Sequence, residues 1–146
     1  MFGYDVVVIG GGQAGLSIGY MLKQLGLRFT ILEKHGCIGT SWRNRYDSLV
    51  LYTPRYLNDL PALPFPGERG GLPDKNETAD YLEQYAQFFA LPLKLGVEVI
   101  RLERAEDAFL VYTRTRPVLR TRAVVVATVP FNCPIGPPCT AMQEVT

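Results

Sequence analysis

The stretch Tyr4–Glu33 reads YDVVVIGGGQAGLSIGYMLKQLGLRFTILE and decides the fold. It opens with an apolar, β-branched run that ends at Gly10, a pattern typical of a buried strand in a parallel sheet. A helical pattern follows and ends at Gly26, and Leu27–Leu32 then has the character of a second short strand. The residues expected on the apolar face of that helix are Ala14, Ile18, Met21, Leu22 and Leu25. The stretch therefore predicts a strand–helix–strand crossover of the right-handed type.

The rest of the chain extends this unit into an α/β fold. Residues 36–71 are loop-like but rich in aromatic side chains, which argues against disorder. A helix is expected to begin near Asn76 or Thr78, with an apolar face made by Ala79, Leu82, Tyr85, Ala86 and Phe89. We predict a Rossmann-like, three-layer architecture in one domain spanning residues 1–146. Its parallel sheet would contain Tyr4–Ile9, Arg28–Leu32 and Ala123–Ala127, and strands at Val97–Leu102 and Ala108–Thr113 would form a smaller β element.

Three glycines lie where a phosphate-binding turn requires them. Gly10, Gly12 and Gly15 form a GxGxxG pattern directly after the first strand and at the start of the helix. The first permits the tight turn, the second lets the backbone approach a pyrophosphate, and the third allows close packing of helix on strand. The free N–H groups at the helix start and the positive end of its dipole would face the anion.

An acidic residue completes the pattern. Glu33 ends the second strand, where its carboxylate can accept hydrogen bonds from both ribose hydroxyls of an adenosine and would disfavour a 2′-phosphate. The unit is therefore expected to bind FAD or NAD rather than NADP. The alternative is a glycine-rich turn that binds nothing.

Composition excludes several other classes of protein. The formal net charge of +1 gives no basic surface for nucleic acid. No apolar run approaches the ~20 residues of a membrane helix, and the N-terminus does not resemble a signal peptide, so we predict a cytoplasmic protein without a membrane partner. Cys37, Cys133 and Cys139 match no metal or redox spacing, and His35 has no partner for acid–base chemistry. We assign no catalytic side chain and no metal site.

The order of motifs resembles class B flavin-dependent monooxygenases of the plant YUCCA type and their bacterial relatives. The resemblance runs from Val6 to about Pro130. The matching motifs are GGGQAG at 10–15, ILEK at 31–34, GTSW at 39–42, RNRYDSLVLYTP at 43–54, LPFPG at 63–67 and YLEQYAQFF at 81–89.

This resemblance implies a set of FAD-binding residues. The phosphate turn at Gly10, Gly12, Gln13, Ala14 and Gly15 would hold the FAD pyrophosphate, and Glu33 would bind the adenosine ribose. The other positions that the family would place near FAD are Lys34 beside the adenosine, Ser41 and Trp42 toward the flavin, Thr53 near the isoalloxazine, Val99 at the adenine, and Thr128 in the family's ATG motif.

Three positions leave alternatives open. Trp42 is either a flavin contact or a core aromatic beneath the long loop. Pro54 stands where animal-type members have an asparagine, so chemistry attributed to that asparagine does not carry over. Val129 replaces the glycine of the ATG motif, and a β-branched residue is strained if that backbone needs a positive φ. Weaker flavin binding would follow.

The resemblance implies the FAD-binding portion of an NADPH-dependent monooxygenase that oxygenates a small organic substrate. Family members continue for roughly another domain's length with a second glycine fingerprint for NADPH, and this chain has one fingerprint only. We therefore expect a truncated chain that does not turn over NADPH by itself. The competing hypotheses are a non-catalytic dinucleotide-binding remnant and an NAD-dependent dehydrogenase.

Overall fold

A computed structural model describes residues 3–128 of the chain. The elements in chain order are β1 (Tyr4–Ile9), α1 (Gln13–Gln24), β2 (Phe29–Leu32), α2 (Thr40–Arg43), the 3-10 helix η1 (Arg55–Leu57), α3 (Lys75–Phe88), β3 (Leu93–Lys94), β4 (Val99–Arg104), β5 (Phe109–Thr113) and β6 (Leu119–Val126). None of the helices in residues 3–128 is long and apolar enough to cross a membrane.

The sheet has six strands in the order β3-β2-β1-β6-β5-β4. Strands β1, β2, β3 and the second half of β6 pair in parallel, and β4, β5 and the first part of β6 pair antiparallel. The predicted α/β, Rossmann-like fold with a parallel sheet and a smaller β element is confirmed. The short strand β3 was not predicted, because two residues are too few to show a period.

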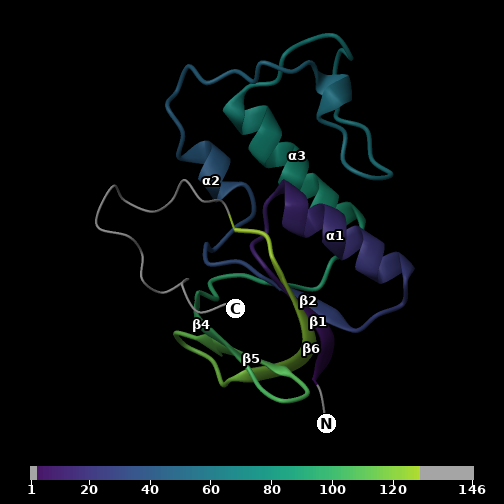
Figure 1. Cartoon of the computed structure of the whole chain (residues 1–146). Coiled ribbons are helices and arrows are strands. Elements are labelled where there is room, and N and C mark those ends of the chain that lie inside the picture. Colours follow the sequence, from purple (N-terminus) through teal and green to yellow (C-terminus); the bar gives the residue numbers. More distant parts are fainter. Residues whose placement is uncertain (1–2, 129–146) are drawn as a thin grey trace.

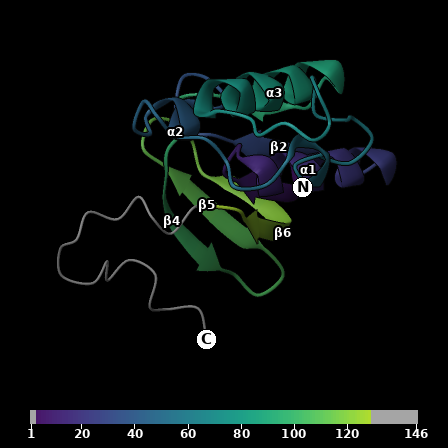
Figure 2. The same ribbon diagram turned by 90° about the horizontal axis from the view of Figure 1, so that it is seen from above.

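Helices cover one face of the parallel strands, and the antiparallel strands curl beneath the other (Figures 1 and 2). The helical side has a core in which Val8 and Ile31 of the sheet meet Leu16 of α1 and Tyr85 of α3. On the opposite side, Val7, Ile9 and Leu32 of the sheet pack with Val97 and Val111. Alternate residues of β1 thus enter different cores, as the pleat of a strand requires.

The apolar face predicted for α1 was partly wrong. Met21 and Leu25 are 49% and 70% exposed. The side of the helix that meets the sheet is instead made by Gly15, Leu16, Gly19 and Leu22. A Cβ at Gly19 would lie 2.7 Å from Cδ1 of Ile31, so the helix lies too close to the sheet for a side chain there. Two of these four residues are glycines, which a pattern of apolar side chains does not reveal.

The start of α3 also differs from the prediction. Asp74, rather than Asn76 or Thr78, caps the helix. Its Oδ1 accepts from the backbone N–H groups of Asn76 and Glu77 at 2.7 and 2.8 Å, and the Glu77 side chain accepts from the backbone N–H of Asp74. This is a capping box, in which the side chain of each of the two residues accepts a hydrogen bond from the other's backbone N–H.

Candidate functional site

The turn between β1 and α1 is held by contacts that exclude side chains. Gly10 has a φ of +107°, and a Cβ there would lie 2.6 Å from the carbonyl oxygen of Ala127. A Cβ at Gly15 would lie 1.9 Å from the carbonyl oxygen of Gly10. Both clashes are with backbone, which cannot move aside as a flexible side chain would. The first and third glycines of the pattern are therefore required by the fold itself.

Gly12 is different, because a Cβ at this position would meet nothing within 4 Å. Gly12 is the N-cap of α1, and no side chain caps the helix there. The first helical hydrogen bond runs from Leu16 N–H to the carbonyl of Gly12 at 2.9 Å. The N–H groups before Leu16 thus have no acceptor within the helix. The open space beside Gly12 suits an anion approaching these donors.

Glu33 is fixed in front of this turn by backbone donors. Its Oε2 accepts from Gly11 N–H at 2.8 Å, and its Oε1 accepts from His35 N–H at 2.9 Å. Each carboxylate oxygen keeps a second lone pair, so the group can still accept two hydroxyl donors. Gly11, which the GxGxxG pattern leaves unspecified, is also constrained, since a Cβ there would lie 3.2 Å from the Cβ of Glu33.

Lys34 and Ser41 line one open cavity of about 400 Å³, together with His35, Asn44 and Arg45. The structure therefore brings these two predicted residues to a common space. Its lining contains two permanent cations and polar side chains. Such a lining is compatible with the polar groups of a nucleotide.

Trp42 belongs to the short helix α2, and its indole Nε1–H donates to Oε1 of Gln13 at 3.3 Å. The ring is also half-buried against the core on the helical side of the sheet. The interpretation of Trp42 as an aromatic packed on the core is therefore supported, and its contact with a flavin stays a prediction. Trp42 is a packing residue whose polar edge contacts the first residue of α1.

The remaining predicted residues lie at different distances from the turn. Thr128 is beside it, because its backbone nitrogen is 3.3 Å from the place where a Gly10 Cβ would stand. Thr53 is exposed, and its hydroxyl donates to Oδ1 of Asn58 at 3.0 Å rather than to the turn. Val99 lies on β4, paired with Thr113. Val129, Cys133 and Cys139 lie outside the described residues.

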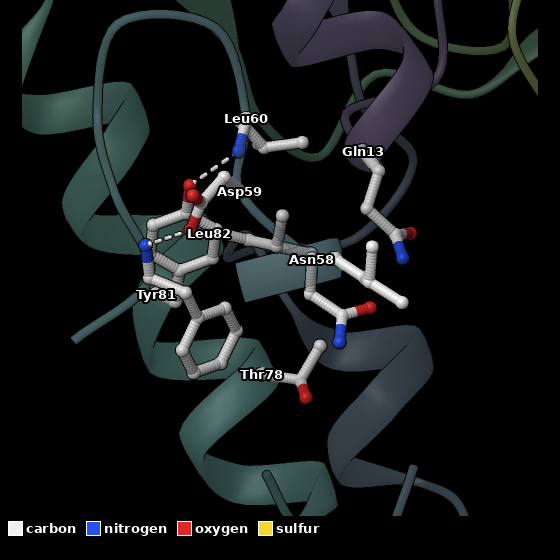
Figure 3. A pocket seen from close by; sticks show the side chains of 9 residues that line it. Gln13, Asn58, Asp59, Leu60, Thr78, Tyr81 and Leu82 are labelled. Atoms are coloured by element: carbon white, nitrogen blue, oxygen red, sulfur yellow. Dashed lines mark hydrogen bonds between the residues drawn. The ribbon is translucent and has the colours of Figure 1, made fainter. Parts of the chain in front are cut away.

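A second cavity of about 210 Å³ opens between the loop after η1 and α3 (Figure 3). The residues that line it are Gln13, Leu57, Asn58, Asp59, Leu60, Phe65, Thr78, Tyr81 and Leu82. The Tyr81 hydroxyl accepts from Leu60 N–H at 2.7 Å and donates to the carbonyl of Leu63 at 2.6 Å. Burial raises the pKa of the Tyr81 phenol, so the hydroxyl stays protonated and keeps donating.

Sequence reasoning missed two cationic side chains, those of Arg43 and Lys75, that join the segment Thr40–Asp47 to α3. Arg43 donates to the carbonyl of Ile38 at 3.2 Å and to the carboxylates of Asp80 and Glu83 at 2.7 and 3.2 Å. Lys75 is buried at the start of α3 and donates to three oxygens of the loop. Arg43 opens the motif at 43–54 and Lys75 belongs to no motif, but their partners across the interface with α3 lie 28 to 40 positions away, so no local spacing predicts the contacts. Within residues 3–128 there is no group of three or more side chains that could hold a metal ion.

The chain is similar to known oxidoreductases over most of its length. Residues 7–143 match the family described as pyridine nucleotide-disulphide oxidoreductase. The chain is 51% identical over 134 residues to an uncharacterized CzcO-like oxidoreductase of Geobacillus kaustophilus, covering 92% of this chain and 38% of the relative. It is 34% identical over 139 residues to indole-3-pyruvate monooxygenase YUCCA4 of Oryza sativa subsp. japonica, covering 84% of this chain and 32% of that enzyme.

The fold is also similar to that of a solved monooxygenase structure. The flavin-containing monooxygenase from Stenotrophomonas maltophilia superposes with a TM-score of 0.81 at 38% identity, covering 87% of this chain and 38% of that chain. The present chain thus spans well under half the length of the proteins it matches. On the evidence of its glycine turn, its acidic residue and these relatives, the chain belongs to the pyridine nucleotide-disulphide oxidoreductase family and matches the N-terminal portion of its flavin monooxygenase-like members.

Proposed function

We propose that this chain is the FAD-binding portion of an NADPH-dependent flavin monooxygenase that oxygenates a small organic substrate. The observation that carries the proposal is the combination of the open space at Gly12 with the fixed carboxylate of Glu33. One offers unpaired N–H groups to a pyrophosphate, and the other offers two free lone pairs to a ribose. Residues 1–146 would form one FAD-binding domain.

Each part of the chain would contribute binding or orientation. The N–H groups at the start of α1 would hold the pyrophosphate, with Thr128 at the neighbouring strand end. Lys34 would lie beside the adenosine, Ser41 would lie toward the flavin end, and Val99 would contact the adenine. Trp42, supported by Gln13, would limit where the flavin end can lie, and Thr53 would meet it from the loop. FAD supplies the redox chemistry when bound, and the chain itself provides position and exclusion of water.

We propose further that NADPH binds in the part of the longer relatives that this chain does not span. The single glycine fingerprint within 1–146 is already assigned to FAD, and one site cannot hold both nucleotides. Hydride transfer needs the nicotinamide held against the flavin. The isolated chain should therefore bind FAD without oxidising NADPH.

The test is a titration of the purified chain with FAD, NAD and NADPH by isothermal calorimetry, followed by absorbance spectroscopy. We expect a yellow protein that binds FAD at a stoichiometry of one. NADPH should bleach the bound flavin no faster than it bleaches free FAD. Binding of NAD in preference to FAD would instead support a dehydrogenase, and binding of no dinucleotide would refute the proposal. Fast bleaching by NADPH would show that the chain holds a second nucleotide site.

A further inference from the structure

The segment Thr40–Asp47, which carries Trp42, is held against α3 by a buried lysine. Lys75 is 7% exposed, yet its side chain carries a charge. Its Nζ donates to the carbonyl oxygens of Arg43 and Arg45 at 3.2 and 2.7 Å and to Oδ1 of Asp47 at 2.7 Å. An ammonium group has three donors, so every proton of this group has an acceptor in one short segment.

One of the two carbonyls, that of Arg43, lies at a helix end. Arg43 ends α2, and the last carbonyls of a helix have no partner within it. A cation at that end both satisfies and electrostatically stabilises such carbonyls. Asp47 closes the set from the solvent side, because its carboxylate is fully exposed while the ammonium is buried. The hydrogen bond and charge of Lys75 lower the pKa of the Asp47 carboxyl.

The same segment is also tied to α3 at its other end. A Cβ at Gly39 would lie 2.8 Å from the Cα and Cβ of Ala79, so the start of α2 lies directly on α3. Trp42 lies between this close contact and the carbonyls that Lys75 binds. Its indole nitrogen donates to Gln13 at the first turn of α1. The backbone N–H groups that could bind an anion belong to the same turn. The direction of the indole therefore depends on how the segment is seated on α3.

We propose that Lys75 is a positioning residue for the cofactor site. Its ammonium fixes Arg43–Asp47 on α3 and thereby places Trp42 against Gln13 at the amino end of α1. Lys75 does not touch the cofactor itself. The inference rests on the proposed function, because the purpose of the placement is FAD binding, although the placement of Trp42 exists without FAD.

Trp42 is the one tryptophan among the 146 residues, so its fluorescence reports the segment directly. Lys75→Met removes the ammonium and keeps the apolar stem. We expect greater quenching of Trp42 emission by acrylamide in the cofactor-free protein and FAD binding weaker by about tenfold. Circular dichroism would establish that the variant is folded.

Lys23→Met is the matched control. The Lys23 ammonium also donates to two backbone carbonyls, those of Phe89 and Ala90, but it does so where α1 and α3 end, away from Trp42. This variant should leave acrylamide quenching and FAD affinity unchanged. An equal effect of both variants would mean that loss of any such lysine loosens the protein, and the proposal would be wrong.

If Lys75→Met does not fold, Asp47→Ala serves instead, because Asp47 is exposed and its removal frees only one end of the segment. For Asp47→Ala we expect acrylamide quenching of Trp42 to increase and FAD binding to weaken, each by about two- to threefold. Normal Trp42 quenching and normal FAD affinity in the folded variant would overturn the proposal. Loss of FAD affinity with unchanged Trp42 quenching would also overturn it, since Lys75 would then act by another route.

The two proposals fail separately. A wild-type chain that does not bind FAD refutes the proposed function, whereas the quenching of Trp42 still decides whether Lys75 positions the segment. A wild-type chain that binds FAD together with a Lys75→Met variant of unchanged quenching and affinity refutes the role of Lys75 alone.

Discussion

Two regions meet at the candidate site and are held by different forces. The first, Tyr4–Glu33, is fixed by apolar packing and by glycines that bring backbone against backbone. The second, residues 36–73, contributes Ile38 and Phe65 to the core and is held in addition by polar side chains that reach its carbonyls and carboxylates from α3, such as Lys75 and Tyr81. The comparison teaches that one half of a binding site can be part of the core, while the other half is a loop fastened to it. Loss of a glycine that the first region needs for packing should therefore cost more stability than loss of a single polar contact to the second region.

The largest effect is expected from Gly15→Ala in the first region. A Cβ 1.9 Å from the Gly10 carbonyl oxygen forces α1 away from β1. We expect the free energy of unfolding to fall by at least about 3 kcal/mol, measured by urea denaturation followed by circular dichroism. FAD binding should be lost with it.

Gly12→Ala is the control within the same motif, because its Cβ would meet nothing within 4 Å. We expect about 1 kcal/mol of destabilisation at most, from the poorer N-cap, together with a marked loss of FAD affinity. Equal destabilisation by the two alanines would contradict the distinction between a glycine required by the fold and one required by the ligand.

The next effect concerns the acid at the border of the two regions. Glu33→Ala removes two acceptors from the ribose, and each hydrogen bond to a charged group contributes about 1.5–3 kcal/mol. We expect FAD binding to weaken by a few kcal/mol at most, measured by calorimetry. The change also frees the N–H groups of Gly11 and His35. An unchanged dissociation constant would show that Glu33 does not meet the ribose.

Tyr85→Phe, which removes a hydrogen bond from α3 to the second region, should have a smaller effect on stability. The Tyr85 hydroxyl donates to the carbonyl of Pro61 at 2.8 Å, and the ring itself is fully buried. Phenylalanine keeps the ring and leaves that carbonyl without its donor. We expect a loss of about 1–2 kcal/mol in the free energy of unfolding, measured by urea denaturation. A neutral result would mean that the loop is held without this bond.

The same tyrosine predicts how stability depends on alkaline pH. Burial raises the pKa of Tyr85 from 10.0 to about 12. A raised folded pKa means that the unfolded chain loses this proton first, so the contribution is complete below about pH 10 and is lost as the pH rises toward about 12. Thermal unfolding across that window should show a fall in Tm, and Tyr85→Phe should flatten it. An identical slope in the variant would contradict the assignment.

The smallest effect is expected at the exposed end of the loop. Asp59 accepts from Phe65 N–H at 2.7 Å and from both terminal nitrogens of Arg69 at 2.8 Å. The Arg69 guanidinium and the Phe65 amide lower the pKa of the Asp59 carboxyl. This contribution is present above the ordinary value of 3.8 and is lost as the pH falls through the lowered folded pKa. Asp59→Asn should lower Tm by about 2 °C at neutral pH, and the difference from wild type should vanish in acid.

The contrast between the regions also explains what the sequence could predict. Strands β1 and β2, the glycine turn and Glu33 follow from local patterns, and the structure reproduces them. The contact of Trp42 with Gln13 spans 29 positions, and those of Lys75 with the loop span 28 to 32. Such pairs depend on how the loop folds back onto α3, which no local period encodes. Gly15 and Gly19 on the buried side of α1 were not predicted for another reason. The helix lies so close to the sheet that only small residues fit there, and an apolar pattern counts only large ones.

One strand links the two cores in a way that bears on how the protein is made. In β6, Thr121 pairs with Tyr4 of β1 and with Phe109 of β5, and its hydroxyl donates to the carbonyl of Tyr4 across 117 positions of sequence. At the other end of β1, the carbonyl of Ile9 accepts a hydrogen bond from the backbone N–H of Ala127. During synthesis, the edge of β1 that pairs with β6 therefore stays unpaired until more than a hundred further residues have been added. Contacts of such long sequence separation slow folding. The glycine turn belongs to the first residues translated, but its contact with Ala127 can form only after β6 has paired with β1.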